Sequence, residues 1–297
     1  MLMSVYYSAA KINLFLQVEG KREDGYHELT SVMQSVSLFD RMDISFHEKE
    51  YDLDAGEVDL GSTEKNTVTR MWRLLKERFA LPGEIRVRLE KNIPVGAGLA
   101  GGSGNGAAVL RAVCDEFGLT LLENEIKEIC AKVGADVAFC FYGGTMLATG
   151  IGEELKRLPN LFPCELLLLN GGFHVSTPEI FSLYDEIASK VESVSVEPLL
   201  HALAHGSEEE VLSSLYNGLE RVAFPRYPSL KALSSTLARM ALPHLMSGSG
   251  PTVFAFTPPA TARQLRAEDP GTLGKMFFVR PVDCGIFSEK EYHNMIF

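Results

Sequence analysis

The stretch IPVGAGLAGGSGNGAAVL, residues 93–110, contains six glycines within eleven positions. Glycine adopts positive φ angles without a steric penalty, so such a stretch can turn several backbone N–H groups toward one point. A helix that starts near Ser103 or Gly104 would add its own free N–H groups and the positive end of its dipole. These features predict a site for an anion, and phosphate is the ligand that fits it best.

The common nucleotide-binding motifs fit this glycine-rich loop less well. Gly96, Gly98 and Gly101 match the dinucleotide fingerprint G-x-G-x-x-G, but that fingerprint requires a second strand with an acidic residue about 20 positions further on. The segment that follows, GLTLLENEIKEICAKVG, has the pattern of a turn and a second helix. The P-loop motif G-K-[ST] and the protein-kinase motifs H-R-D and D-F-G do not occur. A glycine turn that serves packing alone remains open.

Histidines and cysteines do not form a metal or disulfide pattern. His201 and His205 are four residues apart in HALAH, a spacing that can bind metal on a helix face, but no Glu completes a catalytic zinc motif. We interpret them as a surface pair and expect no metal site made by protein ligands alone. The five cysteines are odd in number, widely spaced and never in C-x-x-C, which is typical of reduced thiols.

The composition restricts the class of partner. The 297 residues are 46% hydrophobic and 23% charged, and the net charge is −11. Nonspecific binding of nucleic acid requires a basic surface, so nucleic acid is not an expected partner. The N-terminus lacks the features of a signal peptide, and no apolar run approaches the ~20 residues of a membrane span. We therefore expect a cytoplasmic protein, without a membrane partner, that is a monomer or a weak homodimer.

Hydrophobic periodicity predicts a mixed α and β protein. Alternation predicts strands over 12–18, 28–38, 42–47 and 85–89, and helical stripes predict helices over 67–79, 107–117 and 123–133. After PNLFP, residues 159–163, we expect a second half with strands near 164–169, 252–256 and 276–280 and helices near 179–190, 208–217 and 229–240. The glycine-rich loop thus connects a strand to a helix in the first half.

Three segments resemble the motifs of the GHMP kinases, the superfamily of galactokinase and the homoserine, mevalonate and phosphomevalonate kinases. PVGAGLAGGSGN resembles the second motif, whose loop wraps the ATP phosphates in those kinases; SAAKINLFL (8–16) resembles the first and MSGSGPTVFAF (246–256) the third. The motifs lie in the expected order and span nearly the whole chain. The resemblance implies an α+β fold of two domains, with an S5-like nucleotide-binding domain over 1–158 and a ferredoxin-like domain over 159–297.

Further segments resemble one branch of that superfamily. REDGYHEL (22–29), GADVAFCFYGGT (134–145) and VSTPEIF (175–181) are similar to the kinases that phosphorylate the 2-hydroxyl of a cytidyl diphosphate alcohol in the non-mevalonate isoprenoid pathway. The resemblance implies an enzyme that uses ATP as phosphoryl donor, with Mg²⁺ accompanying the ATP.

The resemblance also implies how the cytosine is bound. Cytosine has two faces that can stack and an edge of hydrogen-bond donors and acceptors. Tyr26 is expected to stack on the base, His27 to hydrogen-bond to it, and Phe181 to close the other face with Thr177 nearby. Asn13, in the first motif, is also expected to contact the substrate. The alternative is that Tyr26 and His27 are only exposed residues of a hairpin.

By the same resemblance, Asp136 is the catalytic base and Lys11 lies beside it. A carboxylate can orient the acceptor hydroxyl and take its proton, and the ammonium group keeps that carboxylate ionised. Structural roles are the alternative for both residues. Asp136 follows Gly134 and could cap the next helix, and Lys11 could be a solvated charge at the edge of a strand.

The expected ATP site consists of the glycine-rich loop and an adenine pocket. The resemblance places the adenine near Asn66 and Lys91, and Ser103 is the hydroxyl expected nearest to Mg²⁺. The loop residues expected to contact ATP are Pro94, Val95, Gly96, Ala97, Gly98, Leu99, Ala100, Gly101, Gly102, Ser103 and Gly104.

The chain departs from the family pattern at a few positions. Ala9 stands where the first motif usually has Pro, and Gly218 replaces the acidic residue of a frequent N-D-L-E. Gly104 and Gly106 replace residues with better helix propensity near the start of a helix.

Two further functions remain open beside the cytidyl alcohol kinase. A GHMP-like module could bind a nucleotide without catalysis, although such a module would have no need of both Lys11 and Asp136. A kinase of homoserine or mevalonate is the other alternative, against which DGYHEL argues.

Overall fold

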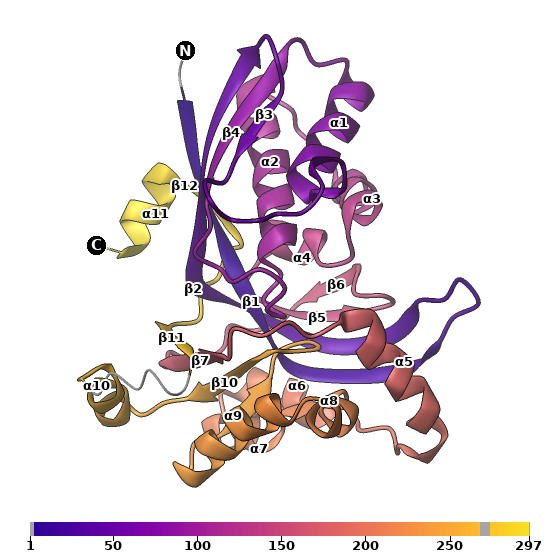
Figure 1. Ribbon diagram of the computed structural model, residues 1–297, viewed down its shortest axis with the longest axis vertical. Helices are drawn as coiled ribbons and strands as arrows, with labels where there is room; N and C mark the ends of the chain where they lie inside the picture. Colours follow the sequence, from indigo (N-terminus) through magenta and orange to yellow (C-terminus); the bar gives the residue numbers. More distant parts are fainter. Residues whose placement is uncertain (1–2, 268–273, 297) are drawn as a thin grey trace.

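Two β-sheets organise the chain, and helices cover them (Figure 1). The computed structural model describes residues 3–267 and 274–296. Within them, the first sheet has eight strands; its main path is β12-β1-β2-β4-β3, while β5 pairs with β2 and β6, and β8 pairs with β1. The second sheet has four strands in the order β11-β7-β10-β9. The predicted α+β class is confirmed.

A long hairpin forms the centre of the first sheet. Its strands are β1 (Met3–Lys21) and β2 (His27–Glu48). The sequence pattern predicts a break in β2 between residues 38 and 42, but the strand is continuous because residues 39–42 pair with β1 after a register shift, and pairing with β4 begins at Arg41. At the turn, the Asp24 carboxylate accepts a hydrogen bond from the Tyr26 N–H at 3.1 Å. Side chains of β1 enter four separate buried clusters, so the hairpin links both halves of the molecule.

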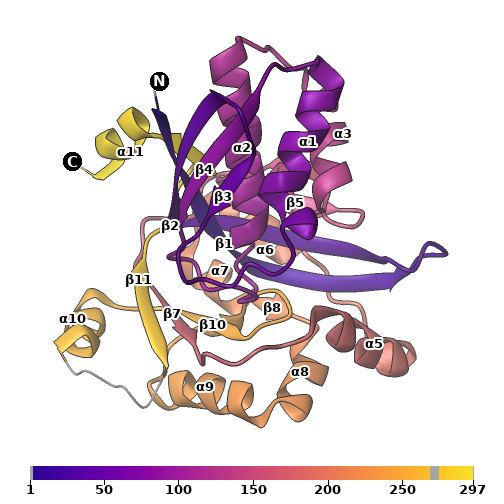
Figure 2. The same cartoon turned by 45° about the horizontal axis from the view of Figure 1, so that its top comes forward.

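Helices α1 to α4 pack on one face of the first sheet, and Figure 2 shows α1, α2 and α3 together above the hairpin. The predicted helices over 67–79 and 123–133 are confirmed to the residue. In α1, Asn66 caps the N-terminus, and Met71, Trp72 and Leu75 form the buried stripe. The elements of this half are β3 (Asp52–Asp54), η1 (Thr63–Lys65), α1 (Thr67–Phe79), β4 (Glu84–Glu90), α2 (Gly101–Phe117), α3 (Glu123–Val133), α4 (Val137–Tyr142), β5 (Thr145–Thr149) and β6 (Glu154–Arg157).

The second half contains the four-stranded sheet and the remaining helices. Its elements are β7 (Leu166–Asn170), α5 (Thr177–Ile187), η2 (Ala188–Lys190), α6 (Glu197–His205), α7 (Glu208–Ser213), β8 (Tyr216–Asn217), α8 (Glu220–Arg226), α9 (Pro228–Arg239), β9 (His244–Met246), β10 (Thr252–Phe256), α10 (Pro259–Ala267), β11 (Lys275–Val279), β12 (Ile286–Ser288) and α11 (Glu289–Ile296). The helix expected over 208–217 is shorter, because Tyr216 and Asn217 leave it to pair in parallel with β1. Helices α6, α8, α10 and α11 were not predicted.

The end of the chain returns to the first sheet. Strand β12 pairs with β1, and α11 packs against both strands (Figure 1). The division between residues 158 and 159 stays a prediction; all four strands of the second sheet follow it. Over residues 3–267 and 274–296, every helix is too short or too polar to cross a membrane.

Candidate active site

Two cavities meet at the glycine-rich loop. The larger one, about 600 Å³, is lined by residues of the hairpin, of α5 and of the third motif. The second one, about 360 Å³, is lined by the glycine-rich loop and the start of α1. Gly98, Ala100 and Ser103 line both cavities. A phosphate group held by this loop would therefore face the larger cavity.

The predicted site residues divide between these two cavities. Those that line the larger cavity are Lys11, Asn13, Tyr26, His27, Asp136, Thr177 and Phe181, together with Gly98, Ala100 and Ser103. Those that line the second are Asn66, Lys91, Pro94, Val95, Gly96, Ala97, Gly98, Ala100, Gly101, Gly102 and Ser103. Leu99 and Gly104 are buried beside the loop and line neither cavity. The structure thus brings nearly all of them to one region.

The start of α2 offers free N–H groups to the second cavity. The helix begins at Gly101, two residues earlier than expected, because Ala100 adopts a left-handed conformation with φ 54° and ends the loop there. No side chain caps this end. The N–H groups of Gly101, Gly102 and Ser103 donate to no acceptor within the described part of the chain. Such a helix end attracts an anion.

Gly104 and Gly106, which depart from the family pattern, let α2 approach β1 and α1 closely. A Cβ atom at Gly104 would lie 3.2 Å from the Ser8 Cβ, and one at Gly106 would lie 3.3 Å from the Thr67 Cβ. These glycines lower the helix propensity of α2, but they permit close packing against β1 and α1. Their presence is thus explained by packing.

Lys11, Asn13 and Asp136 form a polar group at the base of the larger cavity. The Lys11 Nζ donates to the Asn13 Oδ1 at 2.8 Å and lies 3.7 Å from the Asp136 Oδ2. The Asn13 Nδ2 in turn donates to the Ser31 hydroxyl at 2.9 Å, which fixes the amide. The Lys11 side chain is only 6% exposed, whereas that of Asp136 is 35% exposed. The ammonium group is therefore held in place beside a carboxylate that a substrate can reach.

This geometry weakens the structural alternatives for both residues. Asp136 occupies the N-cap position of α4, but its side chain accepts no capping hydrogen bond. Lys11 is buried, so it is not a solvated charge at a strand edge.

The residues expected to bind the base lie at the tip of the hairpin and on α5, which is beside it (Figure 1). Tyr26 is 60% exposed and its ring is free to receive a base. His27 stacks directly on Phe181, with ring centroids 4.7 Å apart, so Phe181 packs on His27 instead of standing apart from it. The Thr177 hydroxyl lies 2.7 Å from that of Ser249 in the third motif.

The sequence did not point to Asp185, which holds the His27 ring in place through a hydrogen bond. Its Oδ1 lies 2.6 Å from the His27 Nε2, and its Oδ2 accepts from the Lys21 Nζ at 2.7 Å. Burial raises the pKa of the Asp185 carboxyl, but the hydrogen bonds from Lys21 and His27 outweigh this effect and leave the pKa below its usual value. The only sequence indication was the spacing of four between Phe181 and Asp185, which places both on one face of a helix.

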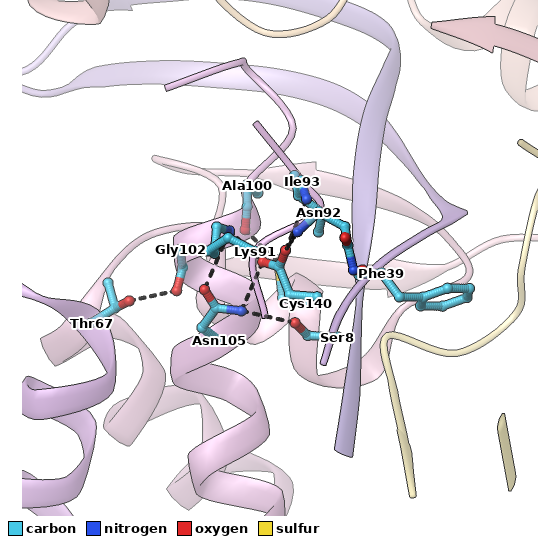
Figure 3. A network of polar contacts seen from close by, with 11 residues as sticks. Ser8, Phe39, Thr67, Lys91, Asn92, Ile93, Ala100, Gly102, Asn105 and Cys140 are labelled. Carbon is cyan, nitrogen blue, oxygen red and sulfur yellow. Dashed lines mark hydrogen bonds and ion pairs between the residues drawn. The ribbon is translucent and has the colours of Figure 1, made fainter. Parts of the chain in front are cut away.

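Asp40 was also missed, and it anchors the glycine-rich loop; Figure 3 labels its partners Lys91, Asn92, Ile93 and Asn105. The Asp40 carboxylate is fully buried and forms an ion pair with Lys91. Its Oδ1 accepts from the N–H groups of Asn92 and Ile93 at 2.8 and 2.9 Å, and its Oδ2 accepts from the Asn105 Nδ2 at 2.9 Å. Asp40 therefore connects the start of the loop to the first turns of α2. Lys91 lines the second cavity with its charge already paired.

The third motif packs against the glycine-rich loop. The Ser247 hydroxyl donates to the Gly98 carbonyl at 2.9 Å. Gly98 has φ +75°, and a Cβ atom there would overlap the Ser247 carbonyl oxygen and lie 2.9 Å from that of Gly250. The Asn217 Nδ2 donates to the carbonyls of Met246 and Gly248, both at 2.8 Å, so the residue beside Gly218 also supports this motif.

Metal-binding side chains do not gather in the part of the chain that the structure covers. No group of three or more His, Cys, Asp or Glu among residues 3–267 and 274–296 could hold a metal ion. His201 and His205 stack with centroids 4.0 Å apart, and the His201 Nδ1 lies 3.7 Å from the Glu210 Oε2. At the start of α1, the Asn66 Oδ1 accepts from the Val68 N–H at 2.9 Å.

Comparison with known proteins gives one consistent family. Residues 66–144 match the model of the GHMP kinases N terminal domain, and residues 199–268 match that of the GHMP kinases C terminal. A 4-diphosphocytidyl-2-C-methyl-D-erythritol kinase of Bacillus pumilus is 40% identical over 253 residues, which are 82% of this chain and 85% of that protein. One of Listeria innocua is 40% identical over 249 residues, 83% of this chain and 84% of that protein.

Solved structures agree with these relatives. A crystal structure of 4-(cytidine 5'-diphospho)-2C-methyl-D-erythritol kinase superposes with a TM-score of 0.78 at 32% identity and covers 93% of this chain and 98% of its own. A homoserine kinase from Cytophaga hutchinsonii superposes with a TM-score of 0.72 at 16% identity, covering 96% and 97%, so it shares the fold.

Proposed function

The chain belongs to the GHMP kinases, and within them to the 4-diphosphocytidyl-2-C-methyl-D-erythritol kinases, and on this premise we propose that it transfers the γ-phosphoryl group of ATP to the 2-hydroxyl of 4-diphosphocytidyl-2-C-methyl-D-erythritol. The observation that carries this proposal is the pair of cavities that share one wall of the glycine-rich loop. ATP occupies the second cavity, and the alcohol occupies the larger one. The reaction is a step of the non-mevalonate isoprenoid pathway.

The glycine-rich loop and the start of α2 hold the phosphates of ATP. Gly101, Gly102 and Ser103 line the second cavity, and their free N–H groups offer it the positive end of the α2 dipole. The adenine lies toward Asn66 and Lys91, which line the same cavity. GHMP kinases use ATP as the phosphoryl donor, and we propose the same donor here.

Asp136 orients the acceptor hydroxyl and accepts its proton. The acceptor is a tertiary alcohol, a crowded and weakly acidic nucleophile, so correct orientation matters more than full deprotonation. Lys11 lies 3.7 Å from the Asp136 carboxylate and can stabilise the negative charge that moves between donor and acceptor. Asn13 holds the ammonium group in the position that this role requires.

Tyr26, His27, Phe181 and Thr177 bind the cytidyl end of the substrate. Tyr26 offers an exposed ring for stacking, and His27 offers its imidazole edge to the base. These residues line the same cavity as Asp136, so one extended substrate can contact them with its cytidyl end and Asp136 with its acceptor hydroxyl.

Mg²⁺ accompanies ATP in this proposal. The residues around the loop fit an ion carried mainly by the phosphates, because Ser103 and Asp136 line the larger cavity and no three-residue metal cluster exists among the described residues. The ion supplies charge neutralisation for the transferred group. The Ser103 hydroxyl is the side chain that would hold it.

The remaining properties follow the same proposal. We keep the division into domains of residues 1–158 and 159–297 as a proposal; one family model ends at residue 144 and the other begins at residue 199, on either side of it. All five cysteines are free, which supports a cytoplasmic location. We propose a monomer or a weak homodimer.

A substrate panel tests this function. ADP release is measured with 4-diphosphocytidyl-2-C-methyl-D-erythritol, homoserine and mevalonate at equal concentrations. We expect turnover with the cytidyl alcohol alone. Turnover with homoserine or mevalonate in its place would assign the chain to another GHMP activity, and ATP binding without any turnover would indicate a non-catalytic module.

A further inference from the structure

The contact between His27 and Asp185 has a consequence for which base the site accepts. We propose that Asp185 is a positioning residue that sets the tautomer of His27, and that this tautomer makes the site accept cytosine and reject uracil. The inference rests on the proposed function, because it assumes that His27 meets the base edge. It adds a structural reason why the site binds cytosine in preference to uracil.

The geometry assigns the hydrogen of the imidazole ring. A carboxylate can only accept hydrogen bonds, and the Asp185 Oδ1 lies 2.6 Å from the His27 Nε2. The hydrogen of neutral His27 must therefore be on Nε2, which leaves a lone pair on Nδ1. The Lys21 ammonium donates to the other carboxylate oxygen, so both oxygens of Asp185 act as acceptors.

The position of the ring is also fixed. The His27 side chain is only 10% exposed, and its face is covered by Phe181. Among residues 3–267 and 274–296, the ring makes no hydrogen bond except the one to Asp185. Since His27 lines the larger cavity, Nδ1 is the ring nitrogen left for a ligand.

An accepting Nδ1 distinguishes the two pyrimidines. Cytosine carries an amino group at position 4, which donates, whereas uracil carries a carbonyl oxygen there, which accepts. The Nδ1 lone pair complements the amino group and faces the carbonyl oxygen of uracil without a hydrogen between them. A buried acceptor that meets another acceptor loses its hydrogen bond, so the uridyl substrate is disfavoured.

The variant Asp185→Asn should invert this preference because of Lys21. An Asn side chain has one accepting oxygen, and the Lys21 ammonium can only donate, so the arrangement that keeps both contacts turns the amide NH₂ toward His27. Nε2 then becomes the acceptor, and the hydrogen moves to Nδ1. The ratio of kcat/KM for the cytidyl substrate to that for its uridine diphosphate analogue should fall about tenfold or more.

Two further variants separate tautomer control from general damage. In the double variant Asp185→Asn with Lys21→Met, the amide oxygen is released and can turn to accept from Nε2, so the base preference should return toward that of the wild type. Glu186→Gln removes the same charge from the neighbouring, exposed position of α5 and should leave the ratio unchanged. Restoration by the second substitution is not expected of a merely structural defect.

Nitrogen-15 NMR of labelled histidine reads the tautomer directly and without turnover. We expect the hydrogen of His27 on Nε2 in the wild type and on Nδ1 in Asp185→Asn. An unchanged cytidyl-to-uridyl ratio in Asp185→Asn, or the same tautomer in both proteins, would overturn the inference. A wild-type enzyme that phosphorylates neither substrate would instead contradict the proposed function, so the two failures are distinguishable.

Discussion

At the scale of single residues, the pair of Lys11 and Asp136 carries the proposed chemistry. The ammonium group is buried and held by Asn13, whereas the carboxylate remains accessible from the cavity. A carboxylate at an N-cap position without a capping hydrogen bond contributes little to its helix. Its location is better explained by the acceptor hydroxyl than by the stability of α4.

Replacement of Asp136 by Asn should reduce turnover and leave the fold intact. The amide keeps the shape of the side chain but cannot accept the proton, so kcat should fall by roughly 10²–10⁴, the usual range for general-base catalysis. The KM for ATP and the melting temperature should change little. Steady-state kinetics and thermal unfolding measure both, and a folded variant with near-normal kcat would remove Asp136 from the catalytic assignment.

Replacement of Lys11 by Met tests whether the two residues act together. The single variant should also lower kcat, because the charge beside Asp136 is lost. The double variant Lys11→Met with Asp136→Asn should lose less than the product of the two single effects, since groups that act as one unit are not additive. Multiplicative losses would mean that Lys11 and Asp136 contribute independently.

At the scale of elements, the glycine-rich loop depends on β2 for its shape. Asp40 receives hydrogen bonds from Asn92, Ile93 and Asn105 and pairs with Lys91 (Figure 3). The loop is therefore fixed at its first residues and, through α2, just past its end. This anchor explains how a loop with six glycines can hold one conformation.

Removal of the Asp40 charge should loosen the loop. Asp40→Asn leaves the Lys91 ammonium buried without its partner, and breaking a buried pair costs about 3–5 kcal/mol. The KM for ATP should rise more than the KM for the alcohol. Adding Lys91→Met removes the unpaired charge, so it should recover part of the free energy of unfolding but not the affinity for ATP.

Asp43→Asn is the matched control for Asp40→Asn. It removes a buried carboxylate from the same strand, where the partner is Arg41 and not the loop. Denaturant unfolding and ATP titration report on both variants. An equal rise of the dissociation constant for ATP in Asp40→Asn and Asp43→Asn would show that Asp40 acts through the overall stability of the protein.

The elements differ in how far the sequence could predict them. Helices α1 and α3 were predicted with their ends because each carries its own apolar stripe and, for α1, its own cap. The continuity of β2 across residues 38–42 could not be predicted, since it depends on pairing with β1 and β4. Strand β8 is similar, because its two residues are held by a strand about 200 positions away.

At the scale of the whole molecule, the site forms where the two halves meet. The three motifs were visible in the sequence because each is a continuous segment. The roles of Asp40 and Asp185 were not visible, because folding brings their partners to them. Asp40 forms hydrogen bonds with residues 92, 93 and 105, and Asp185 forms hydrogen bonds with residues 21 and 27. Carboxylates whose partners lie far away in the sequence have no local sequence pattern.

Glu220 makes the free energy of unfolding of the protein depend on pH. Desolvation raises the pKa of its carboxyl to about 7, although the Met246 N–H donates to it at 2.8 Å. Between the ordinary pKa of a glutamate and pH 7, the unfolded chain releases this proton while the folded chain keeps it. The folded state then binds more protons, so its stability is highest below that window and falls as pH rises through it.

A comparison with Glu220→Gln isolates this contribution. One pKa unit corresponds to about 1.4 kcal/mol, so the effect amounts to a few kcal/mol at most. Urea unfolding is measured at about pH 5 and about pH 8, near the two ends of the window. Between these two pH values the free energy of unfolding should fall more in the wild type than in the variant. Equal losses would mean that Glu220 ionises in the folded state as it does in the unfolded one.

The most direct test of the central claim is the phosphorus-31 NMR spectrum of the product formed from ATP and 4-diphosphocytidyl-2-C-methyl-D-erythritol. The account predicts a new phosphomonoester signal beside an unchanged diphosphate pair. Because the 2-hydroxyl is tertiary, its carbon carries no hydrogen, and the new signal should lack three-bond splitting from a carbinol proton. The same signal should form far more slowly with Asp136→Asn. A phosphomonoester signal split by carbinol protons, or no new signal while ATP remains bound, would contradict the account.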